Sequence, residues 1–146
     1  MKNIIFTAFL AIVIVSVYAF ENPKVTFKAN TKEGIQFHKG TWDEVLQIAK
    51  KENKLIFLDV CATSYEPCKK LKKNTFSTTE VGRIFNQRFV CLAFDGEQED
   101  GAKWTQKYKL RRFPSLLFMD GKGKVVAQTG GYHESNNLIE LGNQFT

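Results

Sequence analysis

Three cysteines and one aspartate are the residues of this 146-residue chain with the clearest capacity for chemistry. Cys61 and Cys68 have six residues between them, a spacing that matches no common metal site, so we expect no bound metal. Cys91 stands alone in a later apolar segment, where a small core side chain is its simplest role. Asp59 lies inside an apolar run, where a carboxylate is costly to bury without a partner. An odd number of thiols leaves at least one unpaired within the chain.

The segments around Cys61 and Cys68 predict a strand followed by a helix. Residues 54–61 are nearly all apolar, as is typical of a central strand buried on both faces. Pro67 suits the first turn of a helix, which we expect to continue through residues 68–74. The two cysteines thus lie near each other, but a disulfide needs Cα atoms within about 7 Å and converging Cβ atoms. The spacing alone does not decide whether they pair.

Strand-like and helix-like segments alternate along the rest of the chain, which ends in a hairpin and a helix. Capping boxes at Thr41–Glu44 and Ser77–Glu80 predict two helix starts, and Asp120–Gly123 predicts a hairpin turn. The order β-α-β-α-α-β-α-β-β-α predicts an α/β fold with a mixed central sheet and helices on both faces. Strands are expected at residues 35–38, 54–61, 88–94, 115–119 and 124–129, with further helices at 100–108 and 135–145.

The N-terminus has the features of an export signal. Lys2 precedes a run of apolar residues at 4–17, and small residues follow where a signal peptidase cleaves. We therefore expect residues 1–19 to be a signal peptide, 20–34 a polar lead-in and 35–146 the folded domain. The expected location is the periplasm or the exterior of the cell. An uncleaved anchor is the alternative, although the run is shorter than the roughly 20 residues of a membrane-spanning helix.

Composition predicts one globular domain. Apolar residues make up 43% of the chain, including 13 phenylalanines, which suffices for a compact core. The formal net charge is +6. Much of the excess lies in short lysine groups that are typical of solvated helix faces, at residues 50–51, 69–70 and 72–73. Without a zinc-finger spacing, an aromatic RNA-binding signature or a long basic run, we expect no nucleic-acid partner.

Two segments of the sequence resemble the thioredoxin family. Residues 57–69 are similar to its active-site region, which runs from a strand with a buried Asp into Trp-Cys-Gly-Pro-Cys-Lys. Residues 108–118 are similar to the conserved proline loop and the strand after it, and Gly130-Gly131 to a later glycine turn. The resemblance implies a thioredoxin fold, with a cis Phe113–Pro114 bond that faces the active-site loop. The positions in register in the first segment are Asp59, Ala62, Pro67, Cys68 and Lys69.

The sequence departs from the family at the attacking cysteine. Tyr65 stands at that position, with Ser64 in place of Trp and Glu66 in place of Gly. Disulfide exchange needs an exposed thiolate, and a tyrosine phenol cannot form a disulfide. Cys68 remains at the resolving position, where it could act as a single thiol or be a buried apolar side chain.

The other catalytic candidates are Cys61 and Asp59. Cys61 could replace the missing thiol and pair with Cys68. Asp59 matches the buried Asp that the resemblance implicates in proton movement, and a structural carboxylate is the alternative. His38 and His133 are expected on the surface or in loops, where neither pairs with a nucleophile.

The proline loop offers a function that needs no cysteine. In the family, the backbone before the cis-proline pairs with an extended substrate segment. Tyr65, Pro67, Arg112, Phe113 and Pro114 are therefore the candidate substrate-binding residues. Arg112 stands where relatives often have Gly, so it could obstruct the groove or select acidic partners.

These observations leave three functions open. The first is a degenerate thioredoxin-like protein that binds thiol-containing or extended polypeptides. The second is an active thiol-disulfide oxidoreductase that uses Cys68 alone or with Cys61. The third is a non-catalytic interaction scaffold. For all three we expect a monomer with a polypeptide or protein thiol partner, no cofactor, and no membrane contact except through an uncleaved signal.

Overall fold

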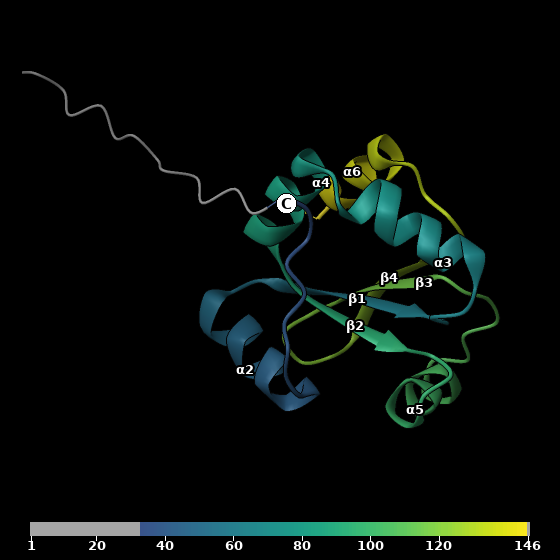
Figure 1. The fold of residues 1–146 in the computed structure, drawn as a ribbon. Helices are drawn as coiled ribbons and strands as arrows, with labels where there is room; N and C mark the ends of the chain where they lie inside the picture. Colours follow the sequence, from purple (N-terminus) through teal and green to yellow (C-terminus); the bar gives the residue numbers. More distant parts are fainter. Residues whose placement is uncertain (1–32, 146) are drawn as a thin grey trace, which may run out of the picture. The chain divides into compact units, whose positions relative to one another are not determined.

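Four strands form the central sheet of the structure, a computed structural model that describes residues 33–145 (Figure 1). Their order is β2-β1-β3-β4. β1 pairs in parallel with β2 and antiparallel with β3, and β3 pairs antiparallel with β4. The predicted mixed sheet is therefore confirmed. The strands are β1 (Leu55–Cys61), β2 (Phe89–Asp95), β3 (Ser115–Met119) and β4 (Val125–Gly130).

Helices cover both faces of this sheet. In Figure 1, α3, α4 and α6 lie above the sheet, and α2 and α5 lie below it. The chain thus has the thioredoxin fold that the sequence predicts. The helices are α2 (Trp42–Glu52), α3 (Glu66–Leu71), the π-helix η2 (Lys72–Phe76), α4 (Thr79–Arg88), α5 (Glu99–Lys107) and α6 (Ser135–Asn143).

Alternation along β1 divides the core into two layers. Successive strand side chains point to opposite faces, so Phe57 packs under α4 and α6, and Leu58 packs toward α2 and α5. The Phe57 ring lies 4.8 Å from the ring of Phe85 and 5.3 Å from that of Phe118, measured between centroids. Burying each such aromatic side chain stabilises the fold by about 2–3 kcal/mol. β1 is therefore fixed in register from both sides.

The two predicted capping boxes have different outcomes. At α2, the Thr41 hydroxyl accepts from the Glu44 amide and the Glu44 carboxylate accepts from the Thr41 amide, which confirms the first box. The second prediction is wrong, because the N-cap of α4 is Thr78 and no side chain caps the helix. The Ser77 hydroxyl instead donates to the carbonyl of Lys73, and that of Thr78 to Thr75.

Two further predictions need correction. The strand expected at 35–38 is reduced to one bridge between Phe37 and Cys91, because the chain already turns at Gly40 into α2. The helix expected at 68–74 ends at Leu71 as an α-helix and continues to Phe76 as a π-helix.

The predicted signal peptide at 1–19, and residues 20–32 of the lead-in, lie outside the described residues. Among residues 33–145, no helix has the length and apolar character needed to cross a membrane.

Candidate functional site

The candidate site lies where β1 ends and α3 begins. Asp59 follows Phe57 by two residues and Cys61 follows it by four, so both side chains share the face of the sheet that Phe57 occupies and point toward α3. Cys68 lies in α3 and faces the sheet. The side chains of Asp59, Cys61 and Cys68 are completely buried. The structure therefore brings together the three catalytic candidates of the sequence.

Asp59 is a buried carboxylate without a hydrogen-bond partner. Neither of its oxygen atoms meets hydrogen-bond geometry with any side chain or backbone group of residues 33–145. Burial raises the pKa of Asp59 to about 6, and the nearby Cys61 thiol and Lys72 ammonium lower this pKa only in part. Burial disfavours the charged form, so a large fraction of Asp59 is protonated in mildly acidic solution.

Cys61 and Cys68 are adjacent free thiols. The two thiols are close enough for each to affect the pKa of the other. Burial is the largest cause that raises the pKa of Cys61, and the negative charge of Asp59 raises it further. Burial also raises the pKa of Cys68, although the nearby Cys61 thiol and the Ala62 backbone oppose this effect. Both sulfur atoms are therefore held as thiols, the form that does not attack disulfides.

Tyr65 occupies the exposed position in front of these thiols. It is the N-cap residue of α3, and its side chain is 48% exposed and makes no capping hydrogen bond. Pro67 lies half-buried in the first turn of α3. The preceding loop is tied to the start of the β2–α5 connection, because Thr63 donates to Asp95 and Ser64 to Glu97. These two hydrogen bonds restrict the loop that precedes Tyr65.

The proline loop lies at the same end of the sheet. Ser115 pairs with Val60, one residue before Cys61, so the loop before Ser115 is next to the end of β1. The Phe113–Pro114 peptide bond is cis. The Pro114 carbonyl accepts from the amide of Gly131 at 2.8 Å. Across the described chain, however, nothing pairs with the amide or carbonyl of Phe113.

The candidate binding residues are oriented differently from one another. The Phe113 ring is half-buried against Gly96, where an added Cβ would lie 2.5 Å from the ring. Arg112 is exposed, and its carbonyl accepts from the Ser115 hydroxyl at 2.6 Å. A ligand at this surface would therefore meet the backbone of Phe113 more than its ring, and the side chain of Arg112.

The remaining candidates lie elsewhere. Cys91 pairs with Phe57, four residues before Cys61 along β1, which corresponds to about 13 Å. Burial raises the pKa of Cys91 as well. His133 binds Thr129 through its ring, at 3.1 Å, and its pKa is lowered by burial. Within the described part of the chain, no three His, Cys, Asp or Glu side chains are grouped to hold a metal ion.

Sequence reasoning did not single out Lys72, whose positive charge lowers the pKa of Asp59. Lys72 belongs to the π-helix, and its charge acts on Asp59, Cys68 and Asp95. A lysine within a lysine-rich stretch carries no signal that would distinguish it from its solvated neighbours.

Comparisons with known proteins agree with this geometry. A family model described as a thioredoxin-like domain matches residues 42–146. The chain is similar to a candidate disulphide-isomerase from Bacteroides thetaiotaomicron, with 34% identity, a TM-score of 0.68, and coverage of 78% of this chain and 97% of that one. It is 27% identical to Thioredoxin-1 of Drosophila melanogaster over 64% of this chain and 83% of that protein.

A longer relative also matches. The chain is 21% identical to the UBX domain-containing protein 7 homolog of Dictyostelium discoideum over 69% of its own length. It spans only 20% of the length of that protein.

Proposed function

The chain belongs to the thioredoxin-like family of thiol-disulfide oxidoreductases, and from this we propose that it binds extended polypeptides beside its cis-proline loop without dithiol turnover. The observation that carries the proposal is the exposed phenol of Tyr65 at the position where the family has its attacking thiol. The thiols behind it, Cys61 and Cys68, are fully buried. An incoming disulfide therefore meets a group with which it cannot exchange.

The backbone of Phe113 supports the binding part of the proposal. Its amide and carbonyl are unpaired within residues 33–145, in a loop that adjoins the end of β1. An extended polypeptide can satisfy both groups by adding a strand-like pair. Tyr65 offers an exposed aromatic surface for an apolar side chain of the same polypeptide. Thiol-containing polypeptides are bound in the same way as others, through the backbone.

The cellular location is a second part of the proposal. The apolar run at residues 4–17, after Lys2, supports export to the periplasm or beyond, with removal of residues 1–19. N-terminal sequencing of the protein from fractionated cells tests this. A first residue near position 20 in the exported fraction is expected, and a chain retained in membranes with Met1 present would contradict it.

An insulin-reduction assay tests the loss of turnover. With dithiothreitol as reductant, the wild-type protein should match its Cys68→Ser variant. Tyr65→Cys should gain activity well above both, because it places a thiol three residues before Cys68. Tyr65→Ser is the matched control, since it removes the ring without supplying sulfur. Wild-type activity well above that of Cys68→Ser would overturn the proposal.

The proximity of the Cys61 and Cys68 thiols favours a second candidate function. In this alternative, the two thiols would reduce a partner disulfide. Their sulfur atoms would form one disulfide bond, and the two protons and two electrons released would convert the partner to two thiols. Incubation with glutathione disulfide, followed by mass measurement without reductant, tests this. A loss of two hydrogen atoms confined to the peptides containing Cys61 and Cys68 would favour the alternative.

A further inference from the structure

Three cations line a pocket beside the proline loop. The pocket has a volume of about 300 Å³ and lies between this loop and β4, the edge strand of the sheet. No acidic side chain lines it. Its lining residues, called the cationic pocket below, are Lys109, Arg111, Arg112, Ser115, Gln128, Thr129 and Gly130.

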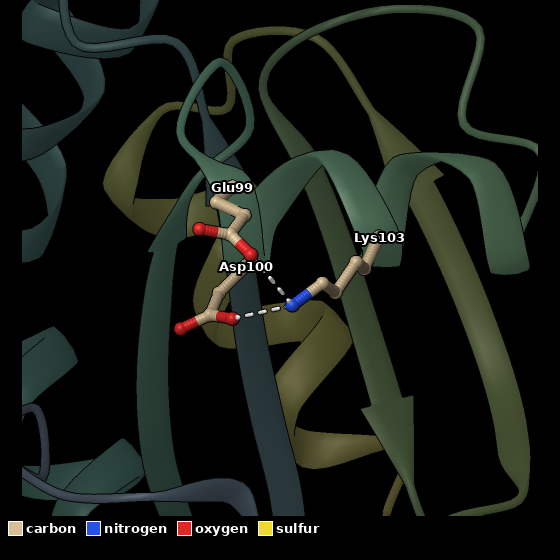
Figure 2. A network of polar contacts seen from close by, with 3 residues as sticks. All are labelled: Glu99, Asp100 and Lys103. Atoms are coloured by element: carbon tan, nitrogen blue, oxygen red, sulfur yellow. Dashed lines mark hydrogen bonds and ion pairs between the residues drawn. The ribbon is translucent and has the colours of Figure 1, made fainter.

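The three cations of the pocket have no charged or hydrogen-bonded partner among residues 33–145. On α5, Lys103 reaches Glu99 at 3.3 Å and Asp100 at 3.4 Å (Figure 2). Throughout residues 33–145, by contrast, the side chains of Lys109, Arg111 and Arg112 make neither an ion pair nor a hydrogen bond. Like charges gathered without a counter-charge repel each other, and an anion that enters the pocket relieves this repulsion.

The loop is held in a shape that presents these side chains outward. Leu110 is buried between the cations, and Lys109 has a left-handed backbone with φ of 51°. The carbonyl of Arg112 is fixed by Ser115. The side-chain stem of Arg112 lies over Gly130, where an added Cβ would be 3.1 Å from its Cγ. This contact restricts the stem of Arg112 before any ligand binds, which reduces the ordering cost of binding.

We propose that the cationic pocket binds a carboxylate side chain, Asp or Glu, of the extended polypeptide that pairs with Phe113. This inference rests on the proposed function and names its preferred ligand. Arg112 is covalently next to Phe113, and an extended chain advances about 3.3 Å per residue. A carboxylate one or two positions from the paired residue thus reaches the pocket. The planar guanidinium groups suit carboxylate oxygens, which can accept two parallel hydrogen bonds.

Binding of matched peptides by the full chain tests the inference. Three labelled peptides of equal length share one apolar, β-branched core, and carry Glu, Gln or Lys on both sides of it. Fluorescence anisotropy at low salt should show roughly tenfold tighter binding of the Glu peptide than of the Gln peptide, as for charge-assisted hydrogen bonds. The Lys peptide should bind most weakly, and added salt should reduce the differences.

Variants locate the preference. The double variant Arg111→Gln with Arg112→Gln should bring the ratio of the Glu to the Gln affinity close to one. Arg112→Lys should leave an intermediate ratio, because charge remains and the planar fork is lost. The control, Lys122→Gln with Lys124→Gln, removes the same charge from the hairpin turn at the other end of β3 and should keep the full ratio. Thermal unfolding confirms that each variant is folded.

Several results would overturn the inference. If the Gln peptide binds and the Glu peptide binds no better, the pocket has no carboxylate preference, although the proposed function stands. If the preference survives the double arginine variant, it arises elsewhere. If inorganic phosphate shifts the amide resonances of Arg111 and Arg112 while the peptides show no preference, the pocket is a small-anion site. If no peptide binds at all, the proposed function itself fails.

Discussion

Asp120, in the turn between β3 and β4, accepts hydrogen bonds from the amides of Lys122 and Lys124 at 2.9 Å each. Asp59, toward the opposite end of the sheet, accepts none from residues 33–145. The turn also pairs the Asp120 amide with the Lys124 carbonyl. At the other end, the backbone groups of Phe113 and the cations of its loop are unpaired within the described residues.

This difference separates two uses of polar groups. A buried donor or acceptor without a partner costs about 1–3 kcal/mol, so groups that serve only the fold are normally satisfied, as in the turn. At the end formed by β1, α3 and the proline loop, the buried, unpaired Asp59 weakens the fold. The exposed, unpaired groups of the loop leave capacity for a ligand. The two aspartates allow the comparison to be tested with nearly isosteric substitutions.

The largest expected effect concerns the thiols. Cys61, Cys68 and Cys91 are buried, and burial raises the pKa of each. Reaction with a water-soluble aromatic disulfide at pH 8 should be roughly five-thousandfold slower than in denaturant, because exposure requires an opening that costs about 5 kcal/mol. The release of chromophore is followed with time. Rapid reaction of two of the three thiols would show that they are accessible to disulfides and would contradict the proposed loss of turnover.

The next effect is on stability through Asp59. Its pKa is about 6 in the folded protein and 3.8 in the reference state. The folded state thus binds the proton more tightly. Protonation of Asp59 therefore stabilises the folded state fully below about pH 4, and this contribution is lost as the pH rises through about 6. Asp59→Asn should be more stable than wild type by up to about 3 kcal/mol at pH 8, and equal to it near pH 4. Urea unfolding at several pH values measures this.

Asp120→Asn should show the opposite sign and a smaller size. The bonds from the Lys124 and Lys122 amides lower the pKa of Asp120. Its stabilisation is therefore present above the unfolded pKa of 3.8 and is lost as the pH falls through the lower, folded value. At pH 7 the variant should melt about 2 °C lower than wild type, and the difference should vanish in acid. If Asp120→Asn were more stable than wild type at pH 7, Asp120 would not differ from Asp59 in its effect on stability.

The smallest effect is expected on α5. Lys103 and its partners Glu99 and Asp100 are all exposed (Figure 2). Exposed ion pairs contribute little, because water and salt screen them. Lys103→Gln should change neither the melting temperature beyond experimental error nor the binding of any peptide. A clear loss of peptide binding would extend the functional surface to α5.

Much of the fold was predictable from the sequence because its signals are local or periodic. The strand at 115–119 is confirmed at both ends, and β1 differs by one residue from the predicted 54–61. The turn that starts at Asp120 follows from its Asp and Gly residues. The box at Ser77–Glu80 failed because a π-helix supplied nearby carbonyls that its hydroxyls bind instead.

The site was predictable only in its residues and not in its electrostatics. The resemblance pointed to Asp59, Cys68 and the proline loop, and the strand period places Asp59 and Cys61 on one face. No pattern in the sequence showed that Cys61 and Cys68 are close enough to affect each other's pKa. Nor did it show that Arg112 lies over Gly130, since that contact joins residues from separate strands and loops.

Under the proposed function, the burial of Cys61, Cys68 and Cys91 has a consequence for how long a polypeptide stays bound. Without a covalent mixed disulfide, residence time is set by backbone pairing and ionic contacts alone. Such a complex would dissociate at the same rate in oxidising and reducing surroundings, and its occupancy would follow the concentration of partner rather than the glutathione ratio.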